Sequence, residues 1–203
     1  DVFTRMKGDK RAMELLKRRI REDGQVKGAD VLKVDSFLNH QMDIALFVEI
    51  GKEFYKRFAH CGVNKILTIE ASGIGIACIT AQFFHCPVVF AKKSKTSNLD
   101  DRLYHAKVVS FTHATVSDVV VSRDYLGPQD NVLILDDFLA NGEALRGLLD
   151  ILRQAGSQVV GAGIVIEKAF QPGGAQLRRE GLRVESLARV ASMSEEGGVV
   201  FAD

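Results

Sequence analysis

An almost unbroken apolar run at residues 131–135 constrains the fold of this chain more than any other feature. A strand that is apolar on both sides must be covered on both faces, which is typical of a parallel sheet between layers of helices. The surrounding sequence agrees, because short apolar runs alternate with helical patterns along most of the chain. We therefore predict an α/β fold with a central, mostly parallel sheet flanked by helices.

The predicted elements follow one another in a regular order. Apolar stripes predict helices at 13–22, between Asp43 and Gly62, at 75–84, at 143–154 and, with a weaker pattern, at 172–180. Apolar runs predict strands at 65–69, 87–91, 131–135, 159–166 and 183–190, and alternation predicts antiparallel neighbours at 107–111 and 118–122. Because ligands of such sheets bind beyond the carboxyl ends of strands, the loops that follow the strands are the candidate sites.

Length and charge limit the classes of protein to consider. A chain of 203 residues fits a single domain, which we expect at residues 13–203. Residues 1–12 are charged and carry no apolar stripe, so we expect them to be an extension before a natural start at Met13. The net charge of +1 gives no field that would recruit nucleic acid or an anionic membrane. No stretch approaches the ~18 uncharged apolar residues of a membrane span.

The potential metal ligands are scattered. Cys61, Cys78 and Cys86 follow neither a zinc nor a C-x-x-C spacing, and the five histidines lack ligand spacing as well. No metal held directly by side chains is therefore predicted. Reduced thiols and the lack of an apolar leader favour a cytoplasmic location.

The strongest candidate site follows the run at 131–135. Asp136 and Asp137 are succeeded by two apolar residues, by the segment 140–142 (Ala-Asn-Gly) and by a helix start at Glu143. Adjacent carboxylates repel each other, so a cation or several hydrogen-bond donors should compensate them. A ribose diol supplies two donors, a magnesium ion shared with pyrophosphate supplies charge, and a glycine before a helix N-terminus suits a phosphate. This combination describes 5-phosphoribosyl-1-pyrophosphate (PRPP), whereas the alternative is a solvated acidic strand end followed by a helix cap.

A family resemblance now becomes specific. Residues 131–144 resemble the PRPP-binding signature of the type I phosphoribosyltransferases, and the Ala-Asn-Gly version is similar to the xanthine-using branch. The likeness runs from Met13 to about Glu195 and includes residues 31–41 and 165–172. The resemblance implies the type I phosphoribosyltransferase fold, with a small hood formed by the N-terminal segment and a flexible loop.

The resemblance also implies roles for the residues of this loop. Asp136 and Asp137 would hold the ribose hydroxyls, and the 5′-phosphate would be bound by Ala140, Asn141, Gly142, Glu143 and Ala144. Hypoxanthine-guanine enzymes place a proposed general base, an aspartate, at the position of Ala140. No carboxylate of this loop can therefore be nominated as the acceptor of the purine proton.

A second loop, residues 70–75, follows a strand and opens a helix. Its G-x-G invites a dinucleotide interpretation, but Cys78 stands at the third glycine position and the next strand ends in two lysines. The resemblance makes this segment the pyrophosphate loop, with Ser72 and Gly73 facing the leaving group and Lys92, or its neighbour Lys93, near the pyrophosphate.

The polar stretch at residues 92–105 has no periodicity. It is either an ordinary solvated loop or, as the resemblance implies, a mobile hood that closes over PRPP and excludes water.

The base contacts implied by the resemblance are Leu32, Asn39 and Lys168. Xanthine has two ring carbonyls and is partly anionic near neutral pH, so its site needs donors and a cation. Lys168 ends an apolar strand and suits that need, although a lysine there could simply be a solvated strand terminus.

The resemblance implies an enzyme of purine salvage that joins xanthine to PRPP, with magnesium bound to PRPP, and releases xanthosine 5′-monophosphate and pyrophosphate. Homodimers are common in this family, so we expect one. Two alternatives remain: a regulator that keeps the PRPP-binding fold without catalysis, and the same enzyme class with guanine, hypoxanthine or adenine as its preferred base.

Overall fold

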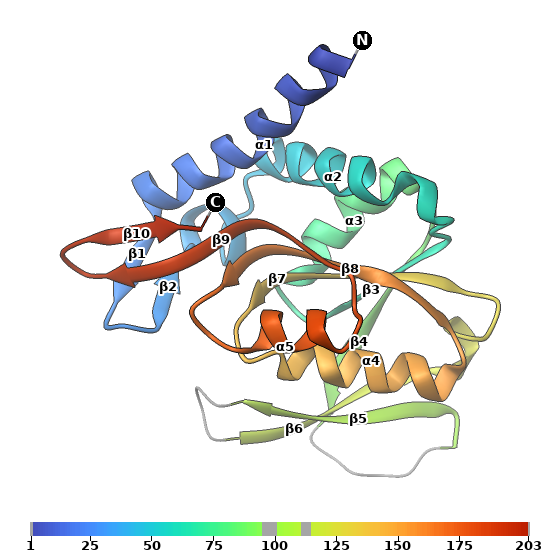
Figure 1. Cartoon of the computed structure of the whole chain (residues 1–203). Coiled ribbons are helices and arrows are strands. Elements are labelled where there is room, and N and C mark those ends of the chain that lie inside the picture. Colours follow the sequence, from blue (N-terminus) through green and yellow to red (C-terminus); the bar gives the residue numbers. More distant parts are fainter. Residues whose placement is uncertain (1, 95–100, 111–114, 203) are drawn as a thin grey trace.

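The computed structural model describes residues 2–94, 101–110 and 115–202. Within these ranges eight strands form one sheet in the order β10-β9-β8-β7-β3-β4-β6-β5 (Figure 1). The pairings from β9 through β8, β7 and β3 to β4 are parallel, and β10, β6 and β5 pair antiparallel at the two edges. The predicted mostly parallel sheet is therefore confirmed.

The strands of this sheet are β3 (Lys65–Ile69), β4 (Val88–Ser94), β5 (Leu103–Ser110), β6 (Thr115–Ser122), β7 (Asn131–Leu139), β8 (Gln158–Lys168), β9 (Val184–Ser194) and β10 (Gly198–Phe201). The helices are α1 (Val2–Asp23), α2 (Ile44–Phe58), α3 (Gly73–Phe84), α4 (Glu143–Ala155) and α5 (Gly173–Arg179), with short turns η2 (Ala59–Cys61) and η3 (Arg123–Tyr125). In the described part of the chain no helix is long and apolar enough to cross a membrane.

Helices cover both faces of the sheet, as a strand apolar on both sides requires (Figure 1). Side chains of α1, α2 and α3 form one core with one face, exemplified by Phe47 and Phe54, which are fully buried. Side chains of α4 and α5 form a second core with the other face, exemplified by Leu148 and Leu177. Strand β7 contributes to both cores, through Leu133 to the first and Ile134 to the second.

Several predicted ends are corrected by the structure. Helix α1 begins at Val2 rather than at Met13, so residues 2–12 continue the helix; their nature as an extension stays a prediction. Strand β7 continues to Leu139 instead of stopping before the acids, because it keeps pairing with β8. Its pairing with β3 ends at Ile134, so the acids lie where β7 has lost one neighbour.

The N-terminal segment adds a small layer that the sequence did not predict in detail. Strands β1 (Gln25–Lys27) and β2 (Val31–Lys33) form a two-stranded antiparallel sheet, followed by a π-helical turn η1 (Asp35–Asn39). The backbone N–H of Gly28 donates to Glu195 Oε1 at 2.7 Å, which ties this layer to the turn between β9 and β10. Of the predicted flexible loop, residues 95–100 lie outside the described residues, while its two ends belong to β4 and β5.

Asp43 is the N-cap of α2, and it makes a testable contribution to stability. Asp43 accepts a hydrogen bond from the Leu46 N–H at 3.1 Å. Replacing Asp43 by Ala should lower the free energy of unfolding in urea by about 1 kcal/mol, because the N–H group loses its acceptor. Replacing Asp43 by Asn keeps an acceptor and serves as the control. Equal losses in both variants would contradict the capping role.

Candidate functional site

The acid pair of β7 is buried. Asp136 is 6% exposed and Asp137 9%, and the Asp137 N–H donates to Asp136 Oδ1 at 2.9 Å. Burial, followed by the neighbouring Asp137 carboxylate, raises the pKa of Asp136 well above its ordinary value, while Lys93 acts in the opposite direction. Among the described residues no cation is directly bonded to either carboxylate, which favours binding of a partner that supplies hydroxyl donors or positive charge.

A stability measurement tests this electrostatic conflict. Asp136→Asn should raise the free energy of unfolding of the ligand-free protein near neutral pH, by about 1–3 kcal/mol if the buried charge lacks partners. The pKa of Asp136 is higher in the folded protein than in the unfolded chain, so the protonated carboxyl group favours the folded state. This stabilisation is complete only below the ordinary aspartate pKa. That stability is lost as the pH rises toward the folded-state pKa, and the gain from asparagine should therefore disappear in acid.

The same substitution at the exposed Asp124 of η3 provides a matched control, for which no such gain is expected. Urea unfolding at two pH values suffices for the comparison. A lower stability of Asp136→Asn near neutral pH would contradict the claim that the buried Asp136 charge destabilises the ligand-free protein.

The loop behind the acids leads directly into α4. Gly142 has φ of +88°, a conformation that favours glycine, and its carbonyl accepts from the Arg146 N–H at 2.9 Å. The residues from Ala140 to Ala144 are half-buried or buried, and Glu143 occupies the first helical position. The N–H groups of the first turn of a helix have no partner within the helix, so the start of α4, which follows the acid pair closely along the chain, suits an anion.

The second loop approaches the acid pair from β3. A Cβ added to Gly73, the first residue of α3, would lie 3.5 Å from Asp136 Oδ1 and would collide with Thr68 Oγ1. Thr68 is fully buried, and its hydroxyl has no hydrogen-bond partner among the residues that the structure describes. Ser72 precedes Gly73 and is half-buried. The structure thus brings together Gly73, Thr68 and the acid pair.

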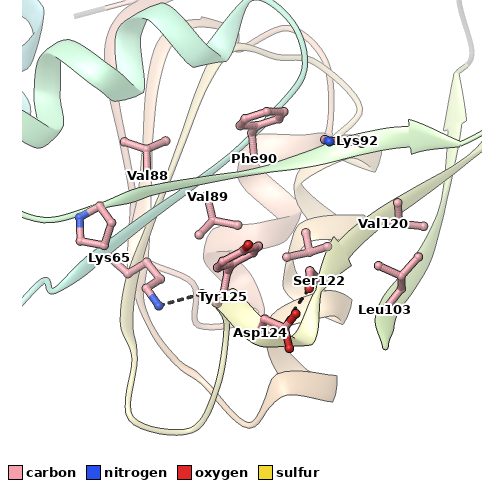
Figure 2. A pocket seen from close by; sticks show the side chains of 12 residues that line it. Lys65, Val88, Val89, Phe90, Lys92, Leu103, Val120, Ser122, Asp124 and Tyr125 are labelled. Carbon is pink, nitrogen blue, oxygen red and sulfur yellow. Dashed lines mark hydrogen bonds between the residues drawn. The ribbon is translucent and has the colours of Figure 1, made fainter. Parts of the chain in front are cut away.

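The two lysines at the end of β4 point to opposite sides of the strand. The backbone N–H of Lys93 donates to the Glu70 carboxylate, and the Lys93 charge acts on Asp136. Lys92 instead lies over the ring of Phe90, 5.8 Å from its centre, and lines a cavity of about 510 Å³ between β4, β6 and η3 (Figure 2). The structure does not bring the Lys92 side chain to the acid pair, because neighbouring residues of a strand alternate between its faces.

Lys168, one of the predicted base contacts, ends β8 and contacts the N-terminal layer. Lys168 Nζ donates to the backbone carbonyl of Asp30, between β1 and β2, and lies 5.7 Å from the centre of the Phe138 ring. Burial lowers the pKa of Lys168, and the Asp30 carboxylate opposes this shift. These contacts connect β8, β7 and the N-terminal layer.

Leu32 and Asn39 belong to that N-terminal layer. The Leu32 side chain is buried in the first core, so only a small part of it can contact a ligand directly. Asn39 ends the π-helical turn, and its buried Oδ1 has no hydrogen-bond partner within the described ranges. An unpaired buried acceptor is costly, so a ligand donor at this position would be favourable.

Sequence reasoning missed two residues of the assembled region, Thr68 and Phe138, and left the choice between Lys92 and Lys93 open. Thr68 was hidden in an apolar strand, where a single threonine gives little signal. Phe138 was treated only as an apolar residue between two motifs, and Lys93 could not be told from Lys92 without knowing which face each lysine takes.

Comparisons with known proteins agree with this geometry. The family model described as "Phosphoribosyl transferase domain" matches residues 45–176. The xanthine phosphoribosyltransferase of Ruminiclostridium cellulolyticum is 57% identical over 191 residues, 94% of this chain and 100% of that protein. The xanthine phosphoribosyltransferase of Lachnoclostridium phytofermentans is 60% identical over 190 residues, 93% of this chain and 98% of that protein.

This chain belongs to the xanthine phosphoribosyltransferase family. Its fold is the type I phosphoribosyltransferase fold, and a solved structure supports the assignment. The adenine phosphoribosyltransferase of Trypanosoma brucei, in complex with AMP, pyrophosphate and ribose-5-phosphate, has a TM-score of 0.71 at 14% identity, and the match covers 86% of this chain and 79% of that one. At this identity the likeness concerns the fold alone.

The phosphoribosyltransferase match has a clear relation to the site. Residues 45–176 include β3, the acid pair, the loop before α4 and Lys168. Leu32 and Asn39 precede the matched residues and come from the N-terminal layer. The residues that match the family model therefore include the acid pair and Lys168. Leu32 and Asn39, the other predicted contacts of the purine base, lie before the matched residues.

Proposed function

We propose that this protein transfers the 5-phosphoribosyl group of PRPP to xanthine, giving xanthosine 5′-monophosphate and pyrophosphate in purine salvage. The observation that carries the proposal is the buried acid pair between two loops, one entering α4 and one entering α3. A sugar carrying a phosphate at one end and a pyrophosphate at the other needs this order of sites. Xanthine is proposed as the purine base because these relatives are xanthine phosphoribosyltransferases.

The proposed roles follow from the chemistry of each group. Asp136 and Asp137 accept hydrogen bonds from the ribose hydroxyls, and the segment 140–144 binds the 5′-phosphate through backbone N–H groups. Ser72 and Gly73 contact the pyrophosphate, and Lys93 adds positive charge from β4. Lys92 keeps a proposed role only if its side chain leaves the Phe90 ring.

The base lies against the N-terminal layer in this proposal. Lys168 donates to a ring carbonyl of xanthine and stabilises its anionic form, and Asn39 offers its unpaired Oδ1 to a base N–H. Leu32 contributes apolar contact or backbone groups. Catalysis then depends on positioning and on stabilising the charge of the leaving pyrophosphate.

Magnesium fits the acid pair as an ion shared with the substrate. Within the described residues no group of three or more potential ligands could hold a metal alone. Magnesium commonly keeps several waters and binds substrate phosphates, so in this proposal it is bound with PRPP, and the nearby charges of Asp136 and Asp137 favour it. When bound, it neutralises charge on the pyrophosphate.

Location and assembly complete the proposal. The free cysteines Cys61, Cys78 and Cys86 are compatible with a reducing cytoplasm. A homodimer is proposed from the family resemblance, and sedimentation analysis of the purified protein tests it.

An assay with purified protein, PRPP, magnesium and each of four bases tests the function. Xanthine is expected to give the highest kcat/KM, with guanine, hypoxanthine and adenine lower. A preference for another base overturns the assigned base but keeps the enzyme class. No transfer to any base, with PRPP still bound in calorimetry, favours a regulator that retains the fold.

A further inference from the structure

A buried carboxylate outside the acid pair lies next to Lys168, the lysine proposed to contact the purine base. Glu167 directly precedes Lys168 in β8 and is 2% exposed. Both of its carboxylate oxygens accept from Arg178, each at 2.7 Å, and Arg189 Nε lies 3.4 Å from Glu167 Oε2. Burial would raise the pKa of Glu167, but the hydrogen bonds from Arg178 and Ser186 bring it below its ordinary value. Glu167 and Arg178 therefore form an ion pair in which both carboxylate oxygens accept hydrogen bonds.

The partner of Glu167 belongs to α5, which lies under the proposed phosphate loop. The Gly173 N–H, at the start of α5, donates to the Ala140 carbonyl at 3.1 Å. A Cβ added to Gly173 would collide with that carbonyl and would lie 2.7 Å from the Asn141 carbonyl oxygen. A Cβ added to Gly142 would lie 3.4 Å from the Gly173 Cα. Helix α5 and the loop are thus in close backbone contact.

The far end of α5 is connected to the same loop by a second ion pair. Arg146 donates to both carboxylate oxygens of Glu180, each at 2.8 Å. Arg146 also closes the first turn of α4 on the Gly142 carbonyl. This pair is more exposed than the Glu167 pair, so it should contribute less.

We propose that Glu167 and Arg178 are positioning residues for PRPP, which act through Gly173 to hold the loop 140–142 in place. The inference rests on the proposed function. The two parallel hydrogen bonds fix the orientation of Arg178 and with it α5, and Gly173 transmits that position to the loop backbone. Glu167 and Lys168 are consecutive in β8. The same strand therefore positions both the lysine proposed to contact the purine base and the helix α5 that contacts the phosphate loop.

The first test is Gly173→Ala. Its Cβ has no room beside the loop backbone, so the loop must shift, and the KM for PRPP should rise about tenfold while the KM for xanthine changes less than about twofold. Alanine favours a helix more than glycine does, so weakening of α5 itself cannot explain the loss.

The matched control is Ala175→Gly. Ala175 is exposed in the same helix, and the substitution lowers helix propensity without adding an atom near the loop. Its KM for PRPP should equal that of the wild type. A tenfold rise in this variant would show that helix stability, and not the position of Gly173, decides PRPP binding, and would overturn the proposal.

The second test keeps the charge and removes the paired geometry. Arg178→Lys leaves Glu167 a cationic neighbour but cannot donate in parallel to both oxygens, so the KM for PRPP should rise about fivefold. Arg179→Lys, at the exposed neighbouring position, should leave it unchanged. This variant decides the question if Gly173→Ala does not fold, which thermal unfolding reveals.

The outcomes separate the two proposals. Wild-type KM values for PRPP in folded Gly173→Ala and Arg178→Lys overturn the positioning role while leaving the proposed function intact. Equal rises in both KM values also overturn it, because they indicate a general loss of structure. A wild-type protein that neither binds PRPP nor transfers it overturns both proposals together.

Discussion

Replacing Asp137 by Asn is expected to lower kcat/KM for PRPP about a hundredfold, which corresponds to about 2.7 kcal/mol of transition-state stabilisation. Asp137 is 9% exposed and lies beside a second carboxylate, in a region where water screens charge poorly. Its proposed hydrogen bonds are charge-assisted, and such bonds contribute about 1.5–3 kcal/mol each. Asparagine keeps the shape but loses the charge, and it can turn an N–H group toward a ribose hydroxyl.

Steady-state kinetics with PRPP varied at saturating xanthine measure this effect. Asp124→Asn is the control, since it removes one negative charge from the exposed turn η3. Thermal unfolding of both variants establishes that they are folded. An unchanged kcat/KM in Asp137→Asn would remove this residue from the site, and an equal loss in both variants would attribute the effect to net charge.

Replacing Lys168 by Met should raise the KM for xanthine about thirtyfold or more while the KM for PRPP changes by less than about threefold. Lys168 lies at the end of β8 in contact with the Asp30 carbonyl and near the Phe138 ring, and the acid pair lies on the neighbouring strand β7. Methionine keeps the apolar stem and its packing but provides no donor and no charge for the base carbonyls.

The pH dependence adds a second criterion for Lys168. Burial lowers the pKa of Lys168, so its charge is lost at a lower pH than that of an exposed lysine. Part of the rise in the xanthine KM at alkaline pH should therefore be absent in Lys168→Met. Lys52→Met on the exposed side of α2 is the control. Equal increases in the KM values of both substrates would contradict a contact with the base.

Much of the fold was predictable because periodicity reports burial directly. The strand at Lys65–Ile69 and the start of α4 at Glu143 were predicted at the residues where they occur. Ends were predicted less well where long-range pairing decides them. The pairing of Asp136 with Ile164 keeps the acids in β7, and no local pattern encodes that partner.

The candidate site divides in the same way. The motif at 136–144 was visible because its residues are consecutive, and a loop between a strand and a helix has a recognisable composition. Thr68 was not visible and Lys93 could not be told from Lys92, since their relation to Asp136 depends on which strands are neighbours and on the face that each side chain takes. The hydrogen bond from Lys168 to the Asp30 carbonyl was not predictable either, because 138 positions of sequence separate the two residues.

The sequence by itself determined the class of sheet, the order of its principal elements and the family, because each of these is recorded in local patterns and consecutive motifs. Only the tertiary structure decided that Lys93 acts on Asp136 while Lys92 lines a cavity on the other side of β4, and that α5 contacts the loop at 140–142. The physical reason is that strand neighbours, side-chain faces and close backbone contacts arise from packing between distant segments.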